Sequence, residues 1–236
     1  MVMHKNRKNN IFVFFIIVFS LVSFLMGEKR VPIKEINKVH LELNSYDIKI
    51  IGVKADNCIF LQGETQNLEF NRNKDELIIK NSKNLSNKSK KLKVFLPLKV
   101  ELQIFLFSGE VAIKDFPNKI FLNSYKCNFS YEGDTFSGFI KIRNGQINIK
   151  AKKLAGETVL KTEYGDIKLN LSEYKNLSLL LKTNFGNFYI NKKYLLKSVR
   201  VFNGIFPMKK LIYNFPGENK FFLKMLSTYG NILLII

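Results

Sequence analysis

The chain has 236 residues, 46% of them hydrophobic, which is enough for one large domain or two small ones with a sizeable core. Its 38 Lys and Arg outnumber its 19 Asp and Glu, giving a net charge of +19, and it contains only 2 His and 2 Cys. Acid–base and nucleophilic catalysis usually need His, Cys or paired carboxylates brought together, so this composition argues against an enzyme.

The N-terminus has the pattern of a membrane signal. Residues 1–10 are polar and basic, and the apolar run Ile11–Met26 follows, interrupted by two serines. As a helix at about 1.5 Å per residue, the run would reach roughly 24 Å, short of a hydrocarbon core of about 30 Å. No small-residue cleavage pair at a convincing spacing and no lipobox Cys follow it. We predict an uncleaved signal anchor, a transmembrane helix over 11–27, and the alternative is secretion after signal cleavage.

The charges around this run predict its orientation. Lys5, Arg7 and Lys8 precede it without any acid, which favours an N-terminus inside a single-pass cell membrane protein and an extracytoplasmic body. The chain beyond the run carries 35 − 19 = +16 charges. Such a body could attract an anionic envelope polymer or phospholipid headgroups. The alternative is that evenly spread Lys residues solvate outward strand faces and protect sheet edges.

Residues 28–38, which contain Pro32, are expected to form a linker, because proline breaks any continuation of the helix. From residue 39 onward, apolar and polar residues alternate with period two, which is typical of β-strands. Residues 81–91 are polar and of low complexity and predict a solvent-exposed loop. The β body is therefore expected to cover 39–236, with its repeats clearest from residue 100 onward.

A corner motif recurs through this body. Its clearest copies, residues 162–169, 183–190 and 227–234, share a polar residue, an aromatic residue, Gly, Asp or Asn, and then alternating apolar residues. Gly accepts φ > 0, and Asp or Asn can close a turn through the side chain. The predicted structural turn residues are Gly109, Gly145, Gly165, Asp166, Gly186, Asn187, Gly230 and Asn231.

The turn glycines have a nearly constant spacing. With Lys126 in one vacant place and Gly204 included, the intervals are 17, 19, 20, 21, 18 and 26 residues, which indicates a repeat array. An antiparallel meander could use Gly-Asp as hairpin turns. The aromatic residue at the corners favours a β-solenoid instead, where equivalent side chains stack. We predict an all-β, single-stranded β-helix with coils of about 20 residues and a ladder of Tyr46, Tyr125, Tyr164, Phe185 and Tyr229.

Other candidate sites have simpler explanations. Asp166 and Asp134 follow glycines as calcium ligands do in nonapeptide solenoids, but the glycine-rich calcium repeat is missing, so no metal is expected. Glu163 and Asp166 could form a carboxylate pair of the kind glycosidases use, although a solvated pair explains them better. Cys58 and Cys127 are expected to be two unrelated buried thiols.

The order of these pieces resembles a known family. An N-terminal anchor, an Asn-x-x-Asp-Ile-x-Ile segment at 44–50, a Lys-Val-Phe-Leu-Pro strand at 93–97 and serial Gly-Asp/Asn repeats are similar to the putative adhesin family of bacterial β-strand repeat proteins. The resemblance covers most of residues 36–236 and implies a β-helix-like solenoid with export or membrane anchoring. It assigns no catalytic or cofactor-binding residues. The chain departs from the family pattern at Lys126, where Gly is missing, and at Gly204, so those coils are expected to be irregular or edge-like.

Three functions remain open at this point. The first is a non-enzymatic adhesin or cell-envelope interaction module, with no nucleic acid partner. The second is an envelope-stress regulatory protein that binds another membrane protein, and the third is an envelope glycan hydrolase. The apolar end of the chain, Asn231 to Ile236, predicts a strand that is covered by an earlier segment or by self-association with a second copy.

Overall fold

The computed structural model describes residues 28–54, 57–81, 89–173, 177–191, 209–214 and 221–236. The predicted basic tail and anchor, residues 1–27, lie outside this part of the chain, as do Gly204 and most of the predicted loop at 81–91. In the part that is described, no helix has the length and apolar character needed to cross a membrane.

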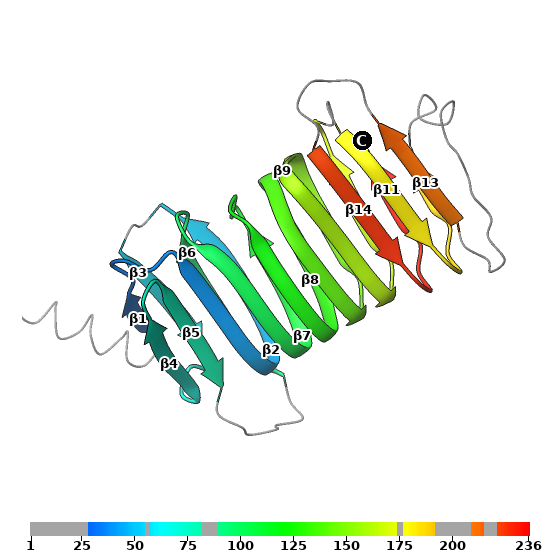
Figure 1. Ribbon diagram of the computed structural model, residues 1–236. Helices are drawn as coiled ribbons and strands as arrows, with labels where there is room; N and C mark the ends of the chain where they lie inside the picture. Colours follow the sequence, from blue (N-terminus) through cyan, green and yellow to red (C-terminus); the bar gives the residue numbers. More distant parts are fainter. Residues whose placement is uncertain (1–27, 55–56, 82–88, 174–176, 192–208, 215–220) are drawn as a thin grey trace, which may run out of the picture.

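The described residues form an all-β structure, as the sequence predicts. The strands are β1 (Lys29–Pro32), β2 (Lys38–Val53), β3 (Cys58–Gly63), β4 (Leu68–Asn73), β5 (Glu76–Asn81), β6 (Lys90–Pro97), β7 (Glu101–Lys114), β8 (Ile120–Asn144), β9 (Ile147–Tyr164), β10 (Ile167–Leu171), β11 (Leu177–Thr183), β12 (Phe188–Ile190), β13 (Lys209–Asn214), β14 (Phe221–Ser227) and β15 (Ile232–Ile235). They lie side by side along one elongated body (Figure 1).

Parallel pairing between successive coils shows that the central part is a solenoid and excludes the meander there. β2 pairs with β7, β7 with β8, and β8 with β9, all in parallel. Phe129 lies opposite Ile147, which lies opposite Ile167, so equivalent residues recur after 18 and 20 positions. Each coil contributes a segment before its corner to one face of the body and a segment after it to the other. We call these the first face and the second face.

Alternation places the core between the two faces. On the first face, Ile104, Leu122, Ile140 and Leu160 are completely buried in successive coils, and they belong to one hydrophobic core with buried isoleucines and leucines of the second face. Complete burial of one such side chain stabilises the fold by about 1.5–3 kcal/mol. The period-two pattern therefore determines which residues point inward, and the polar residues between them form the outer surface.

Antiparallel strands finish the N-terminal end of the stack and the first face at the other end, where the second face ends on the parallel strand β12. β3 pairs with β1 and β6, and β4 with β5, at the N-terminal end, while β13 pairs with β11 at the other. β1 is a strand within residues 28–38, where a linker was expected. Its residue Val31 packs against the core, which gives this short segment an apolar anchor that its composition did not reveal.

The last strands of the chain lie inside the stack. β14 pairs with β9 on one side and β11 on the other, and β15 lies between β10 and β12. In Figure 1, red β14 accordingly lies between β9 and yellow β11. The prediction that an earlier segment covers the C-terminal strand is confirmed, since β12 precedes β15 in sequence.

Candidate functional site

The corner of each coil is shaped by close approach to the preceding coil. A Cβ built on Gly165 would lie 2.0 Å from the carbonyl oxygen of Gly145, and one on Gly230 would lie 1.8 Å from that of Gly165. The predicted turn residues Gly109, Gly145 and Gly186 make the same kind of contact, at 1.9–2.0 Å, with Tyr46, Cys127 and Gly230. At each of these five glycines a Cβ would collide with the backbone of the neighbouring coil, which explains the glycine of the motif.

The polar residue that opens the motif bridges two coils. The hydroxyl of Thr162 donates to the carbonyl oxygen of Gly145 at 3.1 Å, and that of Ser227 donates to Gly165 at 3.0 Å. The Ser227 hydroxyl also accepts the backbone N–H of Gly230 at 2.8 Å. Each such hydroxyl satisfies polar groups at a corner where the backbone turns out of the regular ladder.

The Asp and Asn of the motif bind the next coil rather than only closing their own turn, which corrects the sequence-based interpretation. Asp166 Oδ1 accepts the backbone N–H of Asn231 at 2.6 Å, and Asn231 Oδ1 accepts that of Asn187 at 3.0 Å. Asp47 and Asn128 make equivalent bonds to the backbone of Glu110 and Gln146. These side chains form a ladder along the solenoid.

Two details of the predicted corner column are wrong. Cys127, not Lys126, occupies the vacant glycine place. Gly109 lies opposite Cys127, and the corner at Gly145 packs on the Cys127 carbonyl. The coil is not irregular there, since β8 runs unbroken through it. Tyr46 is fully buried and takes no part in an exposed aromatic ladder.

The other predicted aromatic residues form two separate exposed stacks. Tyr229 stacks on Tyr164 and on Phe185, each with ring centroids 4.8 Å apart and planes within 5°. Tyr125 stacks instead on Phe107, at 5.3 Å. Tyr125 lies one position earlier in its coil than Tyr164 does, as the pairing of Asn144 with Tyr164 shows, so the stacks do not join.

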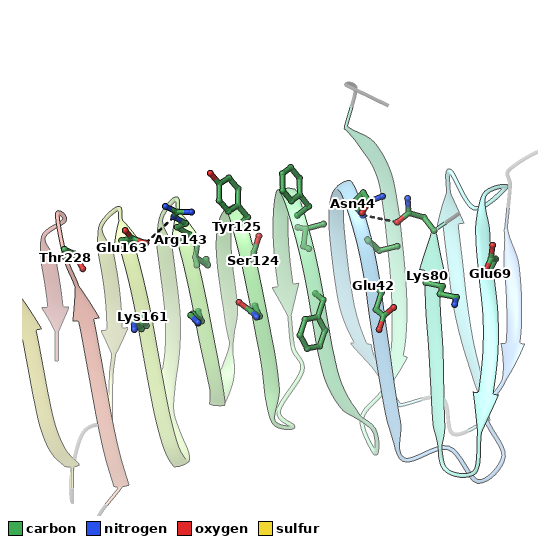
Figure 2. Close-up of a pocket in the computed structure, with 18 residues that line it drawn as sticks. Glu42, Asn44, Glu69, Lys80, Ser124, Tyr125, Arg143, Lys161, Glu163 and Thr228 are labelled. Carbon is green, nitrogen blue, oxygen red and sulfur yellow. Dashed lines mark hydrogen bonds and ion pairs between the residues drawn. The ribbon is translucent and has the colours of Figure 1, made fainter. Parts of the chain in front are cut away.

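A groove of about 1420 Å³ runs across the first face beside these corners. Its lining includes three aromatic and three cationic residues: Phe105, Phe107, Tyr125, Lys141, Arg143 and Lys161. Figure 2 shows Tyr125, Arg143 and Glu163 following one another along one side of the groove, with Lys161 deeper on the strands. The sequence gives no sign of this site, because its residues come from coils 18–20 positions apart and share no motif.

The groove is aromatic in its middle and cationic toward β9. Phe107 is 57% exposed and Tyr125 44%. Arg143 lies over the Tyr125 ring, 5.2 Å from its centroid, and its Nε is 3.3 Å from Glu163 Oε2. Lys141 and Lys161 are exposed and lie directly opposite each other on β8 and β9. Like charges in that position destabilise a sheet unless an anion lies near them.

The candidate catalytic and metal-binding residues either have other partners or lie far apart. Glu163 pairs with Arg143 and Asp166 belongs to the corner ladder, so each half of the proposed carboxylate pair has another partner. Asp134 pairs with Lys152 at 2.7 Å. Among the described residues, no group of three or more His, Cys, Asp and Glu could hold a metal ion. His40 lies 3.4 Å from Glu42 and 3.5 Å from Glu76, on β2 between β5 and β7.

The two cysteines are free, which confirms that they are unrelated. Cys127 is buried, whereas Cys58 is only half-buried, contrary to expectation. Burial raises the pKa of the Cys127 thiol to about 12. A thiol so far from ionisation is a poor nucleophile at neutral pH, so Cys127 serves packing.

These features define an extended β-solenoid with structural corners and an open groove on one face. The chain belongs to the Toastrack DUF4097 family, whose model matches residues 3–201. This confirms the resemblance to the adhesin-like β-strand repeat proteins that the sequence suggested. No curated protein matches the sequence.

Solved structures similar to this chain have names that point to adhesion or lipid binding. A putative cell adhesion protein from Clostridium sporogenes has 16% identity and a TM-score of 0.43, with 88% of this chain and 97% of that chain covered. A putative adhesin from Bacteroides fragilis has 14% identity and a TM-score of 0.46, covering 88% and 96%. A putative lipid binding protein from Parabacteroides distasonis has 11% identity and a TM-score of 0.28, covering 89% and 96%.

Proposed function

We propose that this chain is a membrane-anchored, extracytoplasmic and non-enzymatic interaction module of the cell envelope, of the adhesin type. It binds an anionic envelope polymer in the groove of the first face. The observation that carries this proposal is the direct opposition of Lys141 and Lys161 beside Arg143 and an aromatic wall. An anionic chain laid across the strands would relieve the repulsion between these cations, and its apolar parts would contact Phe107 and Tyr125.

The charge of the body supports the same partner. The chain beyond the N-terminal run carries +16, so a polyanion is attracted over several ångströms before contact. The predicted anchor would hold the groove outside the cytoplasmic membrane, where anionic polymers are abundant and nucleic acid is not the expected ligand.

Binding of the full-length chain in detergent micelles to purified teichoic acid tests the proposal, with neutral dextran as the control polymer. We expect binding that falls steeply between low salt and about 0.5 M salt, since the Debye length shrinks from about 10 Å at 0.1 M toward 3 Å at 1 M. Equal retention of dextran, or no retention of teichoic acid at low salt, would contradict the proposal.

Protease added to intact cells tests the location. The body should be degraded in intact cells, and the predicted extracytoplasmic position would be wrong if it survived there and was lost only after lysis.

One observation favours the regulatory alternative, in which the first face binds another membrane protein. Phe105, Phe121 and Phe139 contact one another in a row on this face, with centroid separations of 5.6 Å, and Phe105 is 36% exposed. Phe121 and Phe139 are half-buried, and a partly exposed apolar row of this kind also fits a protein partner. A stable complex with a membrane protein that resists high salt, without polymer binding, would support this alternative.

A further inference from the structure

The C-terminal coil fills a slot between two coils that precede it in sequence. β14 pairs in parallel with β9 and β11, and β15 pairs in parallel with β10 and β12. Without residues 221–235, both walls of this slot would present unpaired strand edges. Such edges recruit any strand of matching register.

The corner contacts on the two sides of the slot are the same in kind. On one side, Ser227 donates to the carbonyl of Gly165 and Asn231 N–H to Asp166 Oδ1. On the other side, the Thr183 hydroxyl donates to the carbonyl of Gly230 at 3.0 Å, and Asn187 N–H donates to Asn231 Oδ1.

The aromatic contacts repeat this symmetry, because the Tyr229 ring lies 4.8 Å from the ring on either side of it. Every one of these contacts comes from the repeated motif. A coil with this motif can therefore satisfy the slot whichever chain it belongs to.

The inserted segment also carries its own share of the core. Leu223, Met225, Ile232 and Leu234 are fully buried inside the solenoid. An identical segment from another molecule would bury the same surface and make the same backbone bonds, which is the condition for exchange of an element between protomers.

We propose that the C-terminal coil, residues 221–235, is exchanged between two copies of this chain, so that each copy fills the slot of the other. The partner is a second copy, and the interface is the slot between β9–β10 and β11–β12. This inference is independent of what the groove binds.

Cysteine pairing across the slot tests the exchange. Lys168 on β10 lies opposite Leu233 on β15, both side chains point outward, and directly paired residues are close enough for a disulfide. Full-length K168C and L233C chains, each with Cys58→Ser, are mixed in detergent micelles, incubated in mild urea and oxidised. Neither chain can form this disulfide alone. The matched control mixes K49C with L233C, since Lys49 is exposed on the same face but pairs with β6 and β7.

We expect a disulfide-linked dimer joined through positions 168 and 233, identified by mass spectrometry, in at least about tenfold excess over the control, because insertion holds the two thiols at high effective concentration. A yield no greater than that of the control would overturn the proposal. The K168C/L233C double variant should close the same disulfide within one chain. Failure to do so would also overturn it, since the register of the slot would then be wrong.

Discussion

At Gly165, a Cβ would lie 2.0 Å from a backbone oxygen of the preceding coil, and φ is +154°. Gly156 also has a positive φ, +90°, but the nearest atom to its Cβ would be 3.9 Å away. Gly165→Ala should therefore cost about 2–4 kcal/mol of unfolding free energy, and Gly156→Ala only the backbone cost of about 1–2 kcal/mol. Urea unfolding of both variants measures the difference. Equal losses would show that the corner approach is not tight.

Thr162 and Thr158 give a second matched pair. Both are buried, but the Thr162 hydroxyl donates to Gly145 while Thr158 Oγ1 has no hydrogen-bond partner among the described residues. Thr162→Val should destabilise the fold by about 1 kcal/mol, and Thr158→Val should leave it unchanged or stabilise it by about 1 kcal/mol. Thermal unfolding distinguishes them, and a larger loss from Thr158→Val would contradict the assigned roles.

Because Cys127 is buried, we expect the free energy of unfolding to decrease at alkaline pH. Burial raises its pKa from 9.0 to about 12, so above pH 9 the unfolded chain releases a proton that the folded chain retains. Stability then falls as pH rises from 9 toward 12, by about 1.4 kcal/mol at about pH 10 from this group. Comparison of urea unfolding at about pH 8 and pH 10 in wild type and Cys127→Ala checks this. An identical decrease in the variant would assign the effect to other groups.

For single residues, the sequence predicts which positions form the corners but not which residues in other coils they contact. Gly165 and Asp166 are recognisable because turn chemistry is local. That Asp166 accepts a bond from Asn231, 65 positions later, depends on coil order, which no local pattern contains. The motif puts Lys126 in the vacant glycine place because it follows Tyr125, as glycine follows the aromatic residue in other copies. The strand register puts Cys127 there instead, opposite Gly109.

Among the elements, the stack of Tyr164, Tyr229 and Phe185 joins three coils. Tyr229 lies in its middle, whereas Tyr189 on β12 is equally exposed, 52% against 51%, and is in neither stack. Tyr229→Ala should cost about 1–2 kcal/mol through its two ring pairs, and Tyr189→Ala less than about 0.5 kcal/mol. Chemical denaturation of both variants is the measurement. Similar effects would mean that stacking adds little to the solenoid.

The strands themselves follow from the period-two alternation and the corner motif, both of which are visible in the sequence. Their spatial order is not. Thr183 and Ser227 begin equivalent corners. The coil with β11 or the coil with β14 could therefore lie next to β9, and either order would make the same corner hydrogen bonds. Only the complete arrangement, with β13 closing the edge of β11, shows the order that the chain adopts.

For the whole molecule, alternation predicted an outer surface with many Lys residues but not where they gather. The groove arises because outward positions of coils 18–20 residues apart line up across the strands. Lys141 and Lys161 meet there. A comparable pair is found on the second face, where Lys49 and Lys93 lie opposite each other on β2 and β6 and Lys93 lies over the Phe95 ring. The two pairs carry equal charge. Replacing each pair separately therefore distinguishes binding in the groove from general attraction of a polyanion to a basic body.

The most direct measurement is the affinity of K141A/K161A and of K49A/K93A for teichoic acid at low salt, each compared with wild type. Removal of the groove pair should weaken binding about tenfold or more, equivalent to about 1.4 kcal/mol, while removal of the second-face pair should change it less than about threefold. Equal losses from both variants, or a greater loss from K49A/K93A, would contradict binding in the groove.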